Sequence, residues 1–159
     1  PMFVKYVQIT TAEEMYQEVT SRSDEQDIII KAAAVADYRP VTVAENKIKK
    51  SPGDKSIALE RTTDILAWLG EHRREGQVLC GFAMETEHMV EHAKEKLTRK
   101  HVDMIAANNV KVAGAGFGTD TNVVTLITED GVEELAKMSK EEVASRIVDA
   151  LLRLRENIE

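Results

Sequence analysis

Two groups of lysine residues carry the positive charge that an anionic ligand would need. Residues 47–50 read KIKK, and Lys96 and Lys100 stand four residues apart, which places them on one face of an expected helix. A lysine side chain carries a compact charge on a flexible stem, so either group could bind phosphate oxygens. A solvated loop explains residues 47–50 without a ligand, and the helix dipole explains Lys96 and Lys100, so both alternatives stay open.

Small residues precede an acidic one at residues 33–40, which read AAVADYRP. Small side chains such as that of Ala34 let a ligand ring or backbone approach closely, and Asp37 could accept a hydrogen bond from a sugar hydroxyl. Aspartate is also a common turn residue, and a turn is the simpler explanation of Asp37 taken alone. The segment is therefore a candidate ligand site with a structural alternative.

Two further segments carry side chains suited to a nucleotide. Each lies at or just after the end of an expected strand. Residues 81–86 read GFAMET, in which Phe82 could pack on a base, although packing in the core is the better explanation of Phe82 taken alone. Asn108 and Asp120 flank a connection rich in glycine. Their side chains serve either the geometry of this loop or contacts with a base and a ribose, and the sequence does not separate the two.

The elements that must position these groups alternate along the chain. Capping-box patterns at residues 11–14 and 139–142 each begin a helix with apolar residues at helical spacing. Helices are also expected at about 62–76 and 87–100, and strands at 3–9, 27–35, 77–83, 103–107 and 122–128. This alternation predicts one α/β domain over residues 1–159, with a three-layer Rossmann-like fold, a mostly parallel sheet and helices on both faces.

Two long connections indicate where a ligand site belongs. Residues 39–55 are polar and rich in lysine, and residues 108–121 are rich in glycine and alanine. Both follow apolar strands, and ligands of open α/β sheets bind where loops leave the carboxyl ends of the strands. We therefore expect the ligand site at that edge of the sheet.

Composition argues against several classes of function. The net charge of −7 disfavours nucleic-acid binding, which depends on an excess of lysine and arginine. No apolar run approaches the roughly 18 residues of a membrane span, so no membrane partner is expected. Cys80 is the single cysteine and cannot form an internal disulfide, which is typical of the reducing cytoplasm. The histidines lack the spacing of a zinc site, and no metal site is expected on the chain itself.

Taken in order, the motifs resemble bacterial phosphopantothenoylcysteine synthetase, the phosphopantothenate–cysteine ligase of coenzyme A biosynthesis. The resemblance covers essentially the whole chain and rests on residues 33–40, 47–50, 64–66, 81–86, 107–108 and 116–122. It implies a CTP-dependent ligase that works through an acyl-cytidylate. The carboxylate of 4'-phosphopantothenate would attack the α-phosphate of CTP, pyrophosphate would leave, and the amine of cysteine would then displace CMP.

The same resemblance implies functions for individual residues. Lys47 would be the catalytic residue and would also bind the phosphates. The implied nucleotide-binding residues are Ala34, Asp37, Lys47, Thr63, Asp64, Ile65, Leu66, Phe82, Lys96 and Lys100, with Asn108 and Asp120 as additional candidates. Mg²⁺ would accompany CTP, and the enzyme would be a cytoplasmic homodimer.

The amino-terminal end departs from the family pattern. The family begins with a strand and a Gly-Gly-Thr phosphate-binding turn, which this sequence lacks. We therefore expect the chain to be the carboxyl-terminal portion of the synthetase, with FMN confined to an upstream decarboxylase domain if one is fused to it. The alternative is a non-catalytic nucleotide-binding or dimerisation module derived from the same fold.

Overall fold

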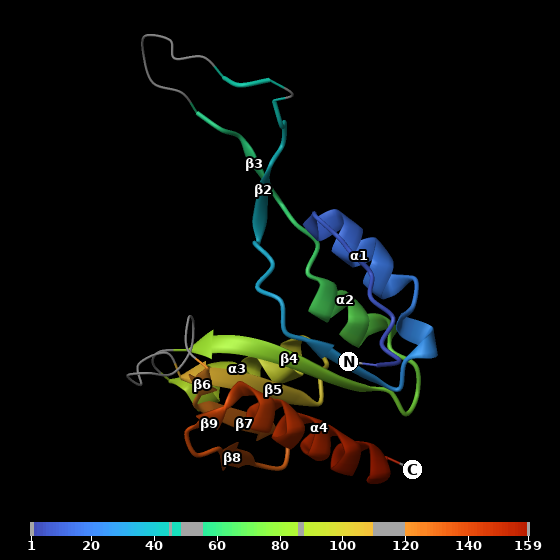
Figure 1. The fold of residues 1–159 in the computed structure, drawn as a ribbon, viewed down its shortest axis with the longest axis vertical. Coiled ribbons are helices and arrows are strands. Elements are labelled where there is room, and N and C mark those ends of the chain that lie inside the picture. The colour runs from blue at the N-terminus through green and yellow to red at the C-terminus, as the bar shows by residue number, and fades with distance from the viewer. Residues whose placement is uncertain (1, 45, 49–55, 86–87, 110–119, 159) are drawn as a thin grey trace.

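A five-stranded mixed sheet is the centre of the computed structural model, which describes residues 2–44, 46–48, 56–85, 88–109 and 120–158 (Figure 1). The strand order is β1-β4-β5-β7-β8. The strands are β1 (Ile28–Lys31), β4 (Val78–Glu85), β5 (Met104–Asn109), β7 (Val124–Thr128) and β8 (Val132–Glu134). β1, β4 and β5 are parallel, whereas β7 is antiparallel to β5 and β8 is antiparallel to β7.

The parallel strands at the centre of the sheet confirm the predicted Rossmann-like α/β class. Helix α2 (Ile65–His72) lies in the connection from β1 to β4, and α3 (Met89–Arg99) lies in the connection from β4 to β5. Parallel neighbours need such crossovers. β7 and β8 are instead joined by a short turn in which the Thr128 N–H donates to the Gly131 carbonyl at 2.9 Å. The last two strands in the order, β7 and β8, therefore form the antiparallel part of the sheet.

Helices cover both faces of the sheet, as predicted. Helix α1 (Ala12–Thr20), α2 and α3 lie over one face, and α4 (Lys140–Glu156) lies over the other (Figure 1). Side chains alternate between the faces along β4, so Val78 and Cys80 join the core under α4, whereas Leu79 and Ala83 join the core under α2 and α3. This alternation decides which side chains can meet at a site.

Both predicted capping boxes are confirmed. The Glu14 N–H donates to the Thr11 hydroxyl at 3.1 Å at the start of α1, and the Glu142 N–H donates to the Ser139 hydroxyl at 3.2 Å at the start of α4. The glutamate of each box also accepts a hydrogen bond from the backbone of its capping residue. Each cap stabilises its helix by about 1 kcal/mol.

Two small antiparallel pairs accompany the main sheet. β2 (Tyr38–Pro40) pairs with β3 (Leu59–Arg61) in a ribbon that rises away from the sheet and helices (Figure 1). Arg39 Nε and Glu60 Oε1 form an ion pair of 2.8 Å across this ribbon. β6 (Thr121–Asn122) pairs with β9 (Met138–Ser139). The polar connection expected at residues 39–55 thus begins inside a strand.

The expected strand at residues 3–9 is wrong. The structure assigns no strand to these residues, and Phe3 is fully exposed with a left-handed backbone, φ 67°. A strand needs a neighbouring backbone to receive its hydrogen bonds, which an apolar pattern alone does not supply. The strand expected at 27–35 is shorter than predicted and ends at Lys31, because the Val35 N–H donates to the Ala33 carbonyl at 3.1 Å and the backbone turns there.

The helix expected at residues 62–76 is also shorter than predicted. It ends at His72 because Arg73 takes an extended backbone, φ −65° and ψ 143°. The Arg73 guanidinium then reaches Asp103 at 2.8 Å. Gly76 does not end the helix; it lies in the following turn with φ 75°.

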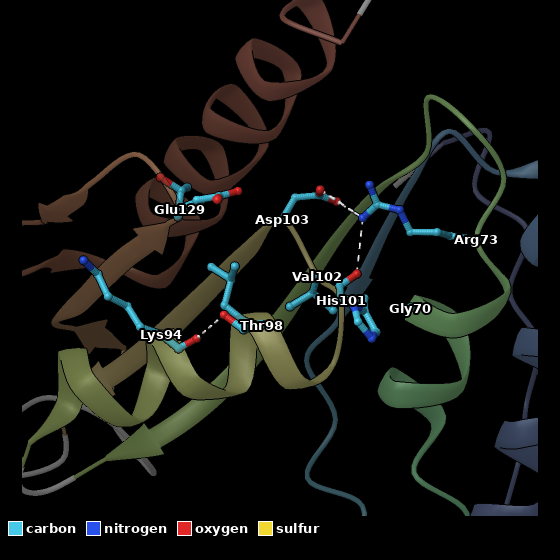
Figure 2. A pocket seen from close by; sticks show the side chains of 10 residues that line it. Gly70, Arg73, Lys94, Thr98, His101, Val102, Asp103 and Glu129 are labelled. Carbon is cyan, nitrogen blue, oxygen red and sulfur yellow. Dashed lines mark hydrogen bonds and ion pairs between the residues drawn. The ribbon is translucent and has the colours of Figure 1, made fainter.

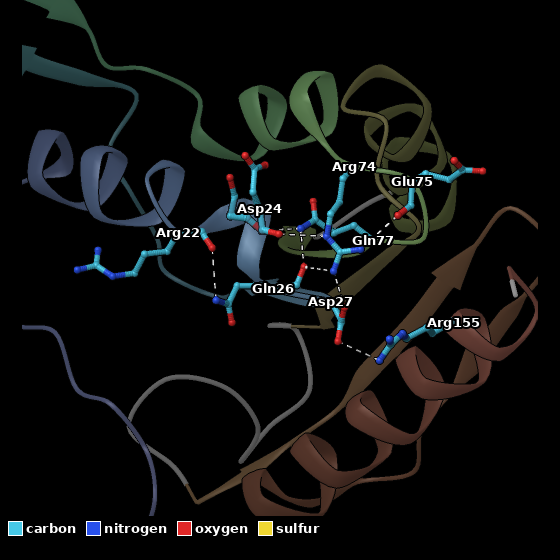
Figure 3. A network of polar contacts seen from close by, with 9 residues as sticks. Arg22, Asp24, Gln26, Asp27, Arg74, Glu75, Gln77 and Arg155 are labelled. Carbon is cyan, nitrogen blue, oxygen red and sulfur yellow. Dashed lines mark hydrogen bonds and ion pairs between the residues drawn. The ribbon is translucent and has the colours of Figure 1, made fainter.

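A polar network connects the segment before β1 to the segment before β4 and to the end of α4 (Figure 3). The Gln77 side chain is buried and donates to the Ser23 and Gln26 carbonyls, each at 2.7 Å. Asp27 forms ion pairs with Arg74 and with Arg155, the latter at 3.2 Å. These contacts fix the amino ends of β1 and β4 beside each other, which sets the register of the parallel pair.

Candidate functional site

The lysine that caps the end of α3 and an aspartate at the start of α2 form an ion pair beside β1. The Lys100 ammonium lies 2.9 Å from Asp64 Oδ2 and 3.3 Å from Oδ1. Asp64 is also the N-cap of α2, because its Oδ1 accepts from the Ala67 N–H at 3.1 Å. One carboxylate therefore caps α2 and holds the Lys100 side chain, which is 21% exposed.

The electrostatics of Asp64 keep it ionised. Burial alone would raise the pKa of Asp64, but hydrogen bonds from Lys100 and Ala67 and the charges of Lys100 and Arg99 outweigh it and hold the pKa below its usual value. Lys31, Arg99 and Lys100 are thus three cationic side chains around one carboxylate. The neighbourhood of Asp64 carries an excess of positive charge in a protein with a net charge of −7.

Sequence reasoning missed two members of this group, Arg99 and Lys31, of which Lys31 is the more deeply placed. It ends β1, and its ammonium donates to the Ala33 carbonyl at 3.3 Å. Burial lowers the pKa of Lys31, the negative charge of Asp64 opposes this shift, and the positive charge of Lys100 adds to it. The available signal was a lysine inside the apolar run of residues 27–35, where a charge is out of place.

The segment that contains Ala34 and Asp37 runs beside the residues that lead into α2. The Thr62 N–H donates to the Asp37 carbonyl at 3.0 Å, and the Thr62 hydroxyl donates to the Ala36 carbonyl at 2.5 Å. Thr63, the next residue, is exposed, as are Ala34 and Asp37. The structure thus brings the predicted residues of these two segments together with Asp64 and Lys100.

Ile65 and Leu66 can contribute only backbone groups to a ligand. Their side chains are 2% and 8% exposed and pack in the core under α2 and α3. Leu66 fits there because residue 81 is glycine; a Cβ at Gly81 would lie 2.4 Å from Leu66 Cδ2. Their prediction as nucleotide-binding residues is therefore compatible with contacts from N–H groups in the first turn of α2.

The structure does not bring Phe82 or Lys47 to this group of residues. Phe82 packs against the core under α4, on the opposite face of the sheet from Ile65 and Leu66. Lys47 is exposed and follows β2, and the β2–β3 ribbon rises away from the sheet and helices (Figure 1). Residues 49–50 of the lysine motif lie outside the described residues.

The remaining predicted residues are spread over two elements. Lys96 is partly buried and lies one turn before Lys100 in α3. Asn108 lies near the carboxyl end of β5, where its Oδ1 accepts from Asn122 Nδ2 at 2.8 Å. The Asp120 carbonyl accepts from the Lys140 N–H at 3.0 Å. Residues 110–119, which include most of the glycine-rich connection, lie outside the described residues.

A cavity of about 560 Å³ is lined by other residues (Figure 2). It is lined by residues from the end of α2, from α3 and from the starts of β5 and the β7–β8 turn, including Arg73, His101, Asp103 and Glu129. Asp103 accepts from Arg73 and, at 2.7 Å, from the Leu79 N–H, so its carboxylate fixes the start of the sheet. The cavity contains none of the predicted site residues.

Two kinds of feature are absent from the described ranges. Within residues 2–44, 46–48, 56–85, 88–109 and 120–158, no three histidine, cysteine, aspartate or glutamate side chains converge so as to hold a metal ion. In the same ranges, no helix has the length and apolar character needed to cross a membrane. The group around Asp64 places three cationic side chains around one carboxylate, so it is the strongest candidate site in the described part of the chain, and its charge suits an anion.

Known proteins are similar to this chain in sequence and in fold. The chain is 45% identical over 151 residues to the coenzyme A biosynthesis bifunctional protein CoaBC of Bacillus subtilis, covering 94% of this chain and 37% of that protein. It is 38% identical over 155 residues to the CoaBC protein of Escherichia coli, covering 96% of this chain and 38% of that protein. A crystal structure of the C-terminal domain of CoaBC superposes with a TM-score of 0.80 at 42% identity, over 99% of this chain and 71% of that one.

The chain spans 37% of the length of the Bacillus subtilis protein and 38% of the length of the Escherichia coli protein, less than half of each. The match to a protein family, by contrast, covers nearly all of this chain, from residue 1 to residue 154. The fold, the motifs and this match agree, and the chain belongs to the family of the DNA/pantothenate metabolism flavoprotein C-terminal domain.

Proposed function

We propose that the chain forms the CTP-binding part of a ligase that joins 4'-phosphopantothenate to cysteine in coenzyme A biosynthesis. The observation that carries this proposal is the excess of positive charge around Asp64, beside the exposed residues Ala34 and Asp37. The identity of 45% to a coenzyme A biosynthesis protein supports it. A Cab2 variant in complex with phosphopantothenate-cysteine has the same fold, with a TM-score of 0.71 at 17% identity.

In this proposal the nucleotide lies along the start of α2. Ala34, Asp37 and Thr63 contact the cytidine, and backbone N–H groups of the first turn of α2 face its phosphates. Lys96 and Lys100 supply cations from α3, while Asp64 holds Lys100 in place. Mg²⁺ enters bound to the triphosphate as part of the substrate and reduces the charge that these lysines must balance.

The chemistry requires a cation at the α-phosphate. Attack by the phosphopantothenate carboxylate on that phosphorus breaks the bond to pyrophosphate and builds charge on the non-bridging oxygens. Lys47 is the proposed residue that stabilises this charge. The amine of cysteine then attacks the acyl-cytidylate, forms the amide bond and releases CMP. The β2–β3 ribbon has to bring Lys47 to the nucleotide, because in the structure Lys47 is exposed beyond β2.

The ribbon also suggests why the enzyme would be a homodimer. It and the segments at its end expose large apolar side chains, namely Tyr38, Val41, Val43, Ile57 and Leu59. Exposed apolar surface of this kind is typical of an interface. We propose that a second copy of the chain covers this apolar surface. We also propose that the protein acts in the cytoplasm. Any FMN would be bound by a separate decarboxylase domain of a longer protein. Light scattering at micromolar concentration checks the dimer, and a monomer mass would contradict it.

A non-catalytic nucleotide-binding or dimerisation module is the second candidate function. A chimera separates it from the ligase: residues 1–154 of this chain replace the matching segment of the Bacillus subtilis CoaBC protein. The ligase proposal expects pyrophosphate release with CTP, phosphopantothenate and cysteine, at a rate near that of the unmodified relative. A folded chimera that binds CTP without releasing pyrophosphate would support the non-catalytic module instead.

A further inference from the structure

Lys31 is a charged residue in an otherwise apolar part of the chain. Three isoleucines precede it, at residues 28–30, and three alanines follow it, at residues 32–34. Its side chain is only partly exposed, and its ammonium donates a hydrogen bond to a neutral group, the Ala33 carbonyl, at 3.3 Å. Removing a lysine ammonium from water is unfavourable unless an anion balances it.

The carboxylate whose charge acts on Lys31, that of Asp64, already binds other groups. Both oxygens of Asp64 accept from Lys100, at 2.9 and 3.3 Å, and Oδ1 also accepts from the Ala67 N–H at 3.1 Å. Asp64 attracts Lys31 through space, whereas Lys100 repels it. Among the described residues, Asp64 therefore does not fully balance the positive charge of Lys31, because its carboxylate already pairs with Lys100.

The direction of the Lys31 side chain follows from the strand. Ile29 packs under α2 and α3 whereas Ile28 packs under α4, so alternation places residue 31 on the α2 side. Lys31 thus lies between the segment that contains Ala34 and the start of α2, the two segments that the proposed nucleotide site uses. It does so on the same side of the sheet as Lys100.

We infer that Lys31 is a phosphate-binding residue of the nucleotide site, and that it and Lys100 together hold the triphosphate beside Asp64. This inference rests on the proposed function for the identity of the ligand, but the charge arrangement itself calls only for a polyphosphate. The unfavourable desolvation of Lys31 is then offset when phosphate oxygens replace lost water. In the free protein Lys31 costs stability, and in the complex it contributes affinity.

Two substitutions and a control test this inference on the intact chain. Lys31→Met keeps the length and apolar stem of the side chain but removes its charge, and Lys31→Arg keeps the charge. Lys94→Met removes an exposed charge from α3, at the cavity that contains none of the predicted site residues. Calorimetry measures binding of CTP and of tripolyphosphate, each with Mg²⁺, and thermal unfolding measures stability without ligand.

We expect Lys31→Met to weaken binding of both ligands by about tenfold to a hundredfold, as loss of a hydrogen bond to a charged group does. Its melting temperature without ligand should equal or exceed that of the parent. Lys31→Arg should bind within about threefold of the parent, and Lys94→Met should match it. A merely structural role would instead lower the melting temperature of Lys31→Met without ligand.

The two ligands keep this inference distinct from the proposed function. If Lys31→Met binds CTP as tightly as the parent, Lys31 is not a phosphate-binding residue, whereas the proposed function stands. If the parent binds tripolyphosphate as tightly as CTP and Lys31→Met loses both, the role of Lys31 is supported and the CTP specificity is overturned. If the parent binds neither ligand, both proposals are overturned.

Discussion

The Lys100 ammonium lies 2.9 Å from the Asp64 carboxylate, and this contact joins the end of α3 to the first turn of α2. The two residues are 36 positions apart in the chain. Because Asp64 also caps α2, a change at Asp64 affects helix stability and the position of a site cation together. Variants of Asp64 must therefore separate the cap from the charge.

Asp64→Asn keeps an oxygen that can accept from the Ala67 N–H, since asparagine caps helices as well as aspartate does. It removes the ion pair with Lys100. The folded-state pKa of Asp64 lies below its usual value, so its charge stabilises the fold above the unfolded pKa of about 4 and loses that effect as pH falls through the folded pKa. Urea unfolding should show the parent more stable than Asp64→Asn at pH 7, with the difference shrinking below about pH 4.

Asp64→Ala is the control that also removes the cap, and it should cost about 1 kcal/mol more than Asp64→Asn. A stability difference between the parent and Asp64→Asn that stays constant from pH 7 to pH 3 would contradict the ion-pair contribution.

Gly70→Ala should displace the end of α3. A Cβ at residue 70 would lie 1.8 Å from the Lys100 carbonyl oxygen, so the two helices cannot keep their approach. Overpacking of this kind costs about 1–3 kcal/mol in unfolding free energy. We also expect weaker CTP binding, because the backbone that carries Lys100 must move. Gly131→Ala is the matched control, since a Cβ there meets nothing within 4 Å. Equal stability of the two variants would rule out the close approach of α2 and α3.

Cys80 should not react with iodoacetamide in the folded protein. Its thiol is buried in the core under α4, and burial raises the pKa of Cys80 to about 12. Only the thiolate reacts, and it is scarce at pH 8. Mass spectrometry should show no labelling over hours at pH 8 and full labelling in urea. Rapid labelling without denaturant would mean that β4 and α4 separate readily.

Lys47→Gln should slow formation of the acyl-cytidylate more than it weakens CTP binding. A cation directed at charge that develops only in the transition state lowers the barrier more than it helps the ground state. Loss of one such contact typically reduces the rate by about 10²–10³. Pyrophosphate release in a single turnover without cysteine, measured in the chimera with the Bacillus subtilis protein, gives this rate. Lys94→Gln is the control, and release at the parent rate from Lys47→Gln would leave residues 47–50 as a solvated loop.

Local signals in the sequence predicted local structure well. The capping boxes that begin at Thr11 and Ser139 involve residues three apart, so their contacts follow from the backbone of one turn. The strand expected at residues 3–9 failed because a strand depends on a partner that its own pattern does not specify. The apolar runs that became β1, β4 and β5 did find partners, and they gave the fold class.

The site was only partly predictable for the same reason. Asp64 and Lys100 were both candidates, yet nothing in the sequence indicates that two residues so distant share a hydrogen bond. Phe82 was grouped with them by motif, whereas alternation along β4 places it on the opposite face. Lys31 was overlooked because the run around it was interpreted as apolar throughout.

Binding of CTP to this chain tests the proposed function most directly. Calorimetry compares CTP with ATP, each with Mg²⁺, on the same protein sample. Phosphates and lysines alone cannot tell the two nucleotides apart, so a preference requires contacts with the base, from the segment of Ala34 and Asp37 or from residues 108–121. We expect CTP to bind more tightly than ATP. Equal affinities, or no binding of either nucleotide, would contradict a CTP site on this chain.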